Sequence, residues 1–545
     1  MVVSRCAFQC DFPKNACAGN NGIYDFVVIM KLKRQSLVSQ GSLSRMLQAA
    51  EQAWQLKDFQ QNIEILERAS RLDPANSGIL MQLGRVYGLR YNYAAAERCF
   101  EKAIRFAPRK TEALATAGRL SLDFASHQLA EHYFQLALKQ TDALPETFVK
   151  LAELYERLRR VDDAAALIDR ALQANSAYAP ALLARARLNR QAGRLEEAER
   201  LLRSFPTTAE REIRIRCCYE LGAVLDRQGR YDEAMTAFLE AKALLCADTQ
   251  LFSGHLQAVR ARRKEIEANC SREIFQGWLE AGQMLQPHRK LALLCGHPRS
   301  GTTLLEQVLD SHPDIISVDE REVFRDDAYA PLTRALPEAT MLPVLKAAQS
   351  DALLQSRENY FHHMELCVGT PIGNRLLIDK NPSYIFFIPA FIRVFPEAKF
   401  LAALRDPRDV CLSCFMLPHY TISQGTAEYA SLDSVAENYV SLMSLWVTLA
   451  PLIEGRYLEV RYENMVDDLE SVSRRVLDFL GAPWDARVLR FDKHAHNKAM
   501  RAPTYVEVSK PIFKTAVGRW RNYQKYLEPY LDKLEPFVKA FGYEA

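Results

Sequence analysis

Small residues recur with a period of 34 residues through the first half of the chain. One series keeps this spacing until its last interval, which is 36 residues; its members are Asn62, Ala96, Ala130, Ala164, Ala198 and Ala234. A second series keeps the same spacings, at Gly84, Gly118, Ala152, Ala186 and Gly222. Small side chains let paired helices approach closely, and each pair then buries its apolar face on the next. The pattern predicts an all-α solenoid of about six two-helix repeats.

Short apolar runs alternate with helical patterns in the second half. The runs that predict buried strands are Leu291 to Cys295, Arg375 to Asp379, Lys399 to Leu404 and Tyr457 to Arg461. Helices are predicted at about 304–309, 382–394, 407–416 and 467–480. Strands that alternate with helices are typical of an α/β domain with a parallel sheet.

These patterns predict a multidomain chain, an all-α solenoid followed by an α/β domain with a P-loop-like first turn. We expect a disordered or weakly ordered tail over residues 1–40, the solenoid over 41–265, a helical linker over 266–288 and the α/β domain over 289–545. Met30 begins a more ordinary N-terminus than Met1, so the position of the true start stays open.

Composition narrows the class of protein. The 545 residues are 48% hydrophobic and 25% charged, as in ordinary globular proteins, and the net charge of +3 gives no argument for nucleic acid. No apolar run is long enough for a membrane span. The 12 cysteines have no framework spacing, and Cys411 and Cys414 lack a second pair for zinc. We therefore expect a cytoplasmic protein with no metal.

The strand at Leu291 leads into a turn with two glycines, Gly296 and Gly301, and then into a helix. Such a turn directs free backbone N–H groups and the positive helix end at one point, which suits an anion. The glycines have P-loop spacing, but Thr302 stands where a P-loop kinase or nucleoside triphosphatase has lysine. Candidate phosphate-binding residues are Pro298, Arg299, Ser300, Gly301, Thr302 and Thr303.

The string Pro298-Arg-Ser-Gly-Thr-Thr303 resembles the 5′-phosphosulfate loop of the sulfotransferases that use 3′-phosphoadenosine 5′-phosphosulfate (PAPS), in particular the tyrosylprotein sulfotransferases and their bacterial relatives. The 34-residue period resembles the tetratricopeptide repeat. The first resemblance implies PAPS as the donor substrate without a metal. The second implies a protein or peptide partner on the repeat surface.

A second phosphate-binding site is predicted at the end of the strand Lys399 to Leu404. Arg405 follows the strand directly, where α/β proteins bind ligands, and Ser413 lies about two helical turns further on. An arginine and a hydroxyl at this spacing suit a phosphate monoester. The segment resembles the 3′-phosphate motif of the sulfotransferases, with Arg405 and Ser413 at the binding positions. A basic residue that some relatives have one turn later is replaced by Leu417.

The resemblance also implies the reacting groups. Glu320 lies 21 residues after Arg299, where the tyrosylprotein sulfotransferases have their general base; Asp319 and Glu322 are rivals. Lys380 directly follows a predicted strand, where the family has a lysine that stabilises the leaving oxygen. Both roles are expectations from the resemblance.

Three further residues come from weaker parts of the resemblance. Tyr462 falls where the family has a tyrosine beside the adenine, and Thr504 where relatives often have a serine that supports the transition state. Lys510-Pro511 and Val517-Gly-Arg-Trp520 resemble a late loop that covers the donor, with Arg519 at its basic position.

The sequence thus predicts an enzyme that moves a sulfuryl group from PAPS to a hydroxyl acceptor. Two alternatives stay open: a repeat scaffold with a degenerate nucleotide-binding domain, and a P-loop phosphotransferase. The acceptor could be a protein tyrosine, a carbohydrate or a small molecule. Neither the oligomeric state nor the repeat residues that contact a partner can be deduced from the sequence.

Overall fold

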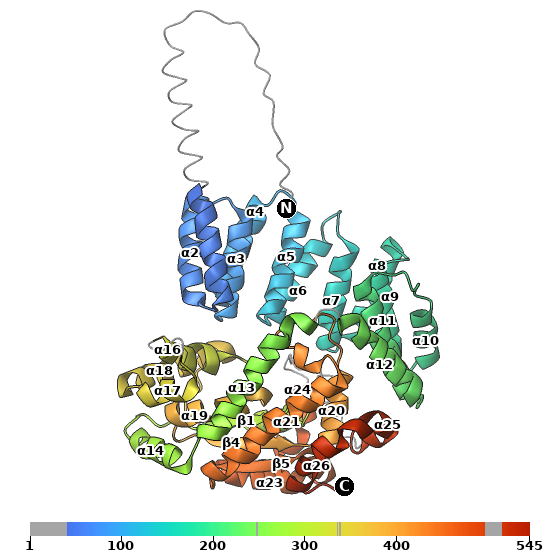
Figure 1. Ribbon diagram of the computed structural model, residues 1–545. Coiled ribbons are helices and arrows are strands. Elements are labelled where there is room, and N and C mark those ends of the chain that lie inside the picture. Colours follow the sequence, from blue (N-terminus) through green and yellow to red (C-terminus); the bar gives the residue numbers. More distant parts are fainter. Residues whose placement is uncertain (1–40, 247–248, 335, 337–338, 496–514, 545) are drawn as a thin grey trace, which may run out of the picture. The chain divides into compact units, whose positions relative to one another are not determined.

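The computed structural model describes residues 41–544 apart from 247–248, 335, 337–338 and 496–514 (Figure 1). The predicted tail, residues 1–40, lies outside the described residues. The chain divides into two compact units: residues up to Tyr87 together with Ala95–Ala107, and Gly88–Ala94 together with the chain from Pro108 onward. Each unit is described by itself. The predicted divisions at residues 40, 265 and 288 stay predictions.

The described residues between 41 and 282 form helices joined by short loops, as the 34-residue period predicts. Residues 41–55 are helical, and the helices that follow are α2 Phe59–Leu72, α3 Ser77–Leu89, α4 Tyr93–Phe106, α5 Lys110–Asp123, α6 His127–Leu138, α7 Pro145–Arg157, α8 Val161–Ala174, α9 Ala179–Gln191, α10 Leu195–Arg203, α11 Arg211–Arg227 and α12 Tyr231–Cys246. Figure 1 shows α5 to α12 as successive pairs of neighbouring helices. A short 3-10 turn, Thr249–Phe252, precedes α13 Ser253–Asn269 and α14 Arg272–Gly282.

The recurring small residues lie where paired helices touch. Ala130 and Ala234 are completely buried. A Cβ added at Gly118 would lie 2.7 Å from the Phe134 ring, and one added at Gly222 would lie 2.7 Å from the Phe238 ring. Each glycine therefore makes room for an aromatic ring of the second helix in its own repeat, which is the physical basis of the period.

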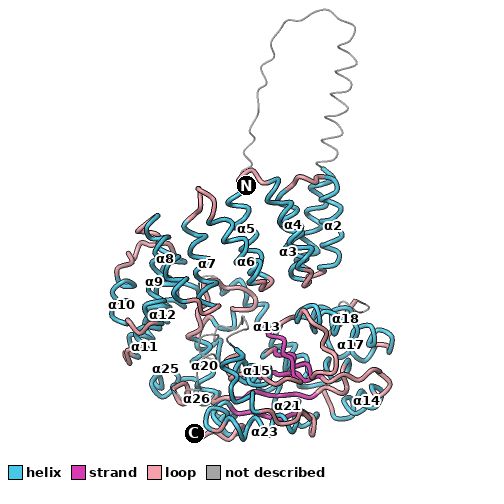
Figure 2. The backbone as a smooth tube through the Cα atoms, turned by 180° about the vertical axis from the view of Figure 1, so that it is seen from behind, coloured by secondary structure: helices cyan, strands magenta, loops and turns pink. Residues whose placement is uncertain are grey.

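Five parallel strands form one sheet in the order β2-β3-β1-β4-β5. Figure 2 shows the strands gathered in this sheet with helices around it. Their bounds are β1 Leu291–Gly296, β2 Ile315–Asp319, β3 Leu376–Lys380, β4 Lys399–Leu404 and β5 Tyr457–Arg461. Four strands agree with the sequence prediction within one residue, and β2 was not predicted. The α/β class with a parallel sheet is confirmed.

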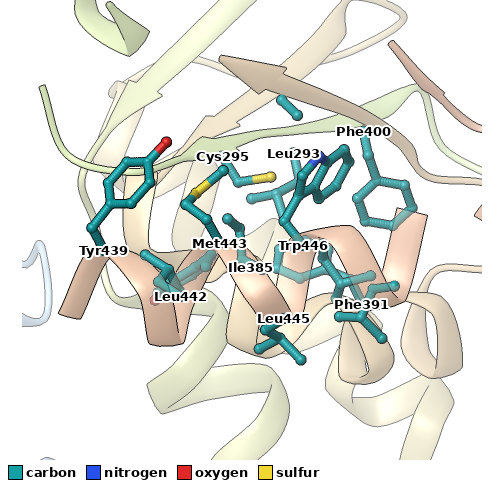
Figure 3. Close-up of a cluster of buried hydrophobic side chains, with 14 of the residues drawn as sticks. Leu293, Cys295, Ile385, Phe391, Phe400, Tyr439, Leu442, Met443, Leu445 and Trp446 are labelled. Carbon is teal, nitrogen blue, oxygen red and sulfur yellow. The ribbon is translucent and has the colours of Figure 1, made fainter. Parts of the chain in front are cut away.

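Alternate residues of β1 face two different cores. Leu293 and Cys295 pack with helices α19 Ile388–Val394 and α21 Leu432–Leu449, where Figure 3 shows Phe391 and Trp446 beside them. Ala292 and Leu294 pack against α15 Thr302–Asp310 and α23 Leu469–Leu480 on the other face. Because both faces are covered, every residue of β1 is buried, and its sequence is a continuous apolar run.

The remaining described helices surround the sheet. They are η2 Phe324–Tyr329, α16 Ala330–Thr333, α17 Met341–Ala347, α18 Ser350–Val368, η3 Pro382–Phe387, α20 Pro407–Phe415, η4 Ala427–Tyr429, η5 Ala450–Ile453, α22 Tyr462–Asp467, η6 Ala486–Arg490, α24 Phe491–Ala495, η7 Arg519–Tyr523, α25 Gln524–Leu527, η8 Glu528–Tyr530 and α26 Leu531–Ala540. The helix predicted at 382–394 begins as the 3-10 turn η3. Within the described parts of the chain, every helix is too short or too polar to cross a lipid bilayer.

Candidate active site

The loop between β1 and α15 turns sharply at Arg299 and Gly301, which have φ angles of 74° and 90°. A Cβ at Gly301 would lie 2.7 Å from Cδ2 of Tyr462, so the glycine lets the loop backbone approach that ring closely. The Ser300 amide donates to the His297 carbonyl at 3.2 Å, which closes the turn. The loop therefore leads directly into the N-terminus of α15, as the anion-binding prediction requires.

Four of the predicted donor-binding residues meet at this loop. Arg299 Nε donates to Ser413 Oγ at 2.9 Å, and Arg405 Nη1 donates to the Arg299 carbonyl at 3.3 Å. The Arg405 guanidinium carbon lies 5.1 Å from the centre of the Tyr462 ring. Arg405 is buried and Ser413 is half-buried. Residues from three distant segments of the sequence thus form one cationic and hydroxylic cluster, which could bind a phosphate.

A late segment of the chain closes over this cluster. Arg405 Nη2 donates to the Ala516 carbonyl at 2.5 Å. The amides of Gly518 and Trp520 donate to the two oxygens of Asp409, at 2.7 and 2.8 Å. Asp409 is almost completely buried, and burial raises the pKa of its carboxyl against the opposing effect of Arg405. Sequence reasoning missed Asp409, although an acidic residue in the first turn of α20 was visible.

Lys380 ends β3 with no exposed side-chain surface, surrounded by carboxylates. Its Nζ lies 2.5 Å from Asp319 Oδ1, 2.7 Å from Glu320 Oε1 and 3.6 Å from Glu306 Oε2. Burial would lower the pKa of this ammonium, but Glu306, Asp319 and Glu320 outweigh it and raise that pKa above its ordinary value. The side chain of Glu320 is 39% exposed, against 11% for Asp319. The predicted base and the predicted cation are therefore direct partners.

The backbone fixes this pair at the edge of the sheet where β1 also ends. The Glu320 amide donates to the Lys380 carbonyl at 2.9 Å, and Glu320 has a φ of 48°. Lys380 is in register with Leu294 of the adjacent strand β1. Since the carboxyl ends of parallel strands lie at one edge, the pair and the phosphate loop share that edge.

The structure distinguishes Asp319 from Glu322, the two other candidates for the general base. Asp319 shares the Lys380 ammonium with Glu320. Glu322 instead accepts a hydrogen bond from the Tyr384 hydroxyl at 2.8 Å and pairs with Arg325 at 3.0 Å. Glu322 therefore belongs to a separate group of contacts.

Sequence reasoning also missed Glu306, a carboxylate of α15 with no exposed surface. Its Oε1 accepts a hydrogen bond from Ser317 Oγ at 2.8 Å, and its other oxygen faces Lys380. A carboxylate within the apolar run Leu304-Leu-Glu-Gln-Val-Leu309 was the available signal, because an acid at a core position needs a partner.

The weaker predictions Arg519 and Thr504 have different outcomes. Arg519 Nη2 pairs with Asp226 Oδ1 of α11 at 2.7 Å and lies 3.5 Å from the sulfur of Met416. Met416 directly follows the helix that contains Ser413, so Arg519 lies near that helix end. Thr504 lies outside the described residues, as does Lys510-Pro511.

A second buried carboxyl, Asp379, precedes Lys380 in β3. Its Oδ2 accepts a hydrogen bond from the Tyr360 hydroxyl at 2.9 Å. Burial raises the pKa of Asp379 to about 7, although the Tyr360 hydrogen bond acts in the opposite direction. In the folded protein this carboxyl is therefore mostly protonated below about pH 7.

We expect Asp379→Asn to be more stable than the parent protein by an amount that grows as the pH rises towards 7. Below the ordinary aspartate pKa of about 3.9 the carboxyl is protonated in both the folded and the unfolded state. Above that pH the unfolded chain ionises first, so the parent loses stability until the folded pKa of about 7 is passed. Urea unfolding midpoints at several pH values from about 5 to about 8 would measure this. A difference that stays constant over this range would contradict the assignment.

Comparison with known proteins agrees with a helical repeat region followed by an α/β domain. Residues 292–486 match the Sulfotransferase family, and residues 78–107, 149–209 and 215–244 match tetratricopeptide repeats. An uncharacterized protein of Aquifex aeolicus is 24% identical over 60% of this chain and 42% of its own length. Protein-tyrosine sulfotransferase 1 of Danio rerio is 25% identical over 42% of this chain and 65% of its own length. The chain thus spans less than two thirds of either relative.

Among solved structures, the sulfotransferase domain of the Synechococcus PCC 7002 olefin synthase matches 48% of this chain and 97% of its own, with 22% identity and a TM-score of 0.33. The family matches cover both the repeat region and most of the domain that contains the parallel sheet. The chain therefore has N-terminal tetratricopeptide repeats followed by a C-terminal domain of the sulfotransferase family, distantly homologous to the protein-tyrosine sulfotransferases.

Proposed function

We propose that this protein transfers a sulfuryl group from PAPS to a hydroxyl acceptor. The observation that supports this most directly is the combination of two clusters at one sheet edge. One is the phosphate cluster of Arg299, Arg405 and Ser413, and the other is the ion pair between Glu320 and Lys380. Membership of the sheet domain in the sulfotransferase family supports the same reaction class.

The phosphate cluster suits the two ends of the donor. The amides at the start of α15 and the hydroxyls of Thr302 and Thr303 would bind the 5′-phosphosulfate, because a helix N-terminus favours an anion. Arg405 and Ser413 would bind the 3′-phosphate through charge-assisted hydrogen bonds. Tyr462 would pack against the adenine. No role is assigned to a metal, since arginine and backbone donors supply the positive charge.

The ion pair suits the transfer step itself. Glu320 would accept the proton of the acceptor hydroxyl while that oxygen forms its bond to sulfur. The bond between sulfur and the bridging phosphate oxygen would break, and adenosine 3′,5′-bisphosphate would leave with the electron pair. The Lys380 ammonium would stabilise the charge that builds on this leaving oxygen. Glu320 is the most exposed of the three carboxylates around Lys380, so it is the one that an acceptor can reach.

We further propose that the acceptor is a tyrosine of a peptide or protein, which the repeats bind. Repeat solenoids offer extended surfaces to peptides and proteins. The relatives named protein-tyrosine sulfotransferase support the choice of a tyrosyl hydroxyl. Carbohydrates and small alcohols are the alternatives, and a panel of the three acceptor classes would separate them by the sulfated product.

The first prediction concerns the donor. Adenosine 3′,5′-bisphosphate is expected to bind without Mg²⁺ and more tightly than ATP or adenosine 5′-monophosphate. Arg405→Ala should weaken this binding by roughly ten-fold to a hundred-fold, because a hydrogen bond to a charged group contributes about 1.5–3 kcal/mol. Isothermal titration calorimetry would measure each affinity. Arg475→Ala, an exposed arginine of α23, is the matched control and should bind as the parent does.

The competing outcomes have distinct meanings. A preference for ATP with Mg²⁺ would indicate a phosphotransferase, and no nucleotide binding at all would indicate a scaffold. Loss of binding in Arg475→Ala as well as Arg405→Ala would show a general loss of folding, which thermal unfolding of each variant would detect.

A further inference from the structure

The last repeat pair contacts the segment that closes over Arg405. Helices α11 and α12 and this segment all belong to the second unit. Asp226, at the end of α11, accepts a hydrogen bond from the Tyr523 hydroxyl at 2.6 Å and pairs with Arg519 Nη2 at 2.7 Å. Tyr523 is completely buried, and the Asp226 side chain is 15% exposed. One repeat carboxylate therefore binds two residues of η7.

The same segment is bound on its other side by the predicted 3′-phosphate motif. Ala516 accepts a hydrogen bond from Arg405, and the amides of Gly518 and Trp520 donate to Asp409. The residues from 516 to 523 thus lie between Asp226 of the repeats and Arg405 of the sheet domain. Because Arg405 donates a hydrogen bond to Ala516, contacts that fix this segment also help to fix the Arg405 side chain.

A second contact joins the repeat pair to the helix that contains Ser413. Lys242 of α12 is 3% exposed, and its ammonium donates to the Tyr429 carbonyl at 2.5 Å. The same ammonium lies 5.1 Å from the centre of the Phe415 ring, at the end of α20. Further along, Lys525 of α25 pairs with Asp232 of α12 at 2.7 Å, where Figures 1 and 2 show α12 and α25 side by side. The repeat pair therefore contacts both η7 and the end of α20, the helix that contains Ser413.

We propose that Asp226 is a positioning residue for donor binding: through Arg519 and Tyr523 it holds the segment 516–523 against Arg405, so that the last repeat sets the affinity for the donor's 3′-phosphate. This inference rests on the proposed function. It assigns to a repeat residue a part in nucleotide recognition, whereas the repeats were expected to bind a protein partner.

The physical reason is preorganisation. Without Asp226, the buried Tyr523 hydroxyl loses its hydrogen bond to this carboxylate and the Arg519 guanidinium loses its ion pair with it. The segment would then spend less time in the closed arrangement, and the apparent dissociation constant of the donor rises by the inverse of that fraction. Because the segment contacts Arg405, the effect should fall on the 3′-phosphate. The 5′ end of the donor should be affected much less.

The test compares two nucleotides that differ at the 3′ position. Adenosine 3′,5′-bisphosphate and adenosine 5′-monophosphate are titrated into the full-length parent, Asp226→Ala, Asp226→Asn and Glu212→Gln. The ratio of the two affinities is the advantage given by the 3′-phosphate. We expect this ratio to fall about ten-fold in Asp226→Ala, as for one lost charge-assisted contact. It should fall less in Asp226→Asn, whose amide oxygen can still accept from Tyr523.

The control and the outcomes separate this inference from the proposed function. Glu212, on the same helix, pairs with Arg216 and its side chain is 58% exposed, so its variant should keep the parent ratio. An unchanged ratio in Asp226→Ala, an equal loss of both affinities, or tighter binding would overturn the inference while the proposed function stands. A parent protein with no 3′-phosphate preference would overturn both. If Asp226→Ala fails to fold, Asp226→Asn and Tyr523→Phe give the same comparison.

Discussion

Glu320→Gln is expected to lower the rate of sulfuryl transfer by roughly 10²–10⁴, which is the usual contribution of a general base. Glutamine keeps the shape of the side chain and its oxygen can still accept from Lys380, but it cannot take the acceptor's proton. The affinity for adenosine 3′,5′-bisphosphate should therefore stay close to that of the parent. The rate is measured as adenosine 3′,5′-bisphosphate released from PAPS, with a tyrosine-containing peptide and 4-nitrophenol as acceptors.

Two matched variants make this prediction specific. Glu322→Gln changes a carboxylate two residues away that contacts Tyr384 and Arg325 instead of Lys380, so it should keep most of the turnover. Asp319→Asn tests the rival that shares Lys380. If Asp319→Asn stops the reaction and Glu320→Gln leaves it unchanged, the base is Asp319 and our assignment is wrong.

Lys380→Met should have two separate effects. Turnover should fall by roughly 10²–10³, because a preorganised donor to the leaving oxygen is lost. Stability should fall by about 3–5 kcal/mol, because removal of one partner from a buried ion pair leaves the other charge without compensation. Glu306, with no exposed surface, is the carboxylate most affected. PAPS turnover under native conditions measures the loss of rate, and urea unfolding measures the loss of stability.

A double variant separates the chemical role of Lys380 from its structural role. Lys380→Met combined with Glu306→Gln removes the ammonium and one of its buried carboxylates together, so part of the lost stability should return. The turnover should stay low, because the leaving oxygen still has no ammonium. Recovery of turnover along with stability would mean that Lys380 acts only as a structural counter-ion.

The sequence predicted the elements whose signal is local. Strand β1 is a continuous apolar run because both faces of the sheet are covered, and Gly118 and Gly222 make room for the rings of Phe134 and Phe238. The strand β2 was missed because Ile315–Asp319 includes Ser317, whose hydroxyl donates a hydrogen bond to Glu306. That hydrogen bond depends on the tertiary structure and leaves no periodic pattern.

The residues of the candidate site also fall into two groups, those that a local sequence motif indicates and those that only tertiary contacts bring together. The loop around Arg299 and the residues Arg405 and Ser413 lie in compact motifs, and their chemistry is visible in the order of residues. The contacts of Glu306 with Lys380 and of Asp226 with Arg519 join residues that are distant along the chain, so no local sequence pattern indicates them. Sequence reasoning could therefore name the donor-binding motifs, but the carboxylates that position their cations required the structure.

The segment 516–523 has a consequence for how the chain folds during its synthesis on the ribosome. Asp409 obtains its two amide donors from Gly518 and Trp520, and the first of these is made 109 residues later in synthesis. Until that stretch emerges, the nascent phosphate motif has an acid that cannot be buried without cost. A chain that stalls before residue 516 would lack both amides, so the burial of Asp409 can be completed only late in synthesis.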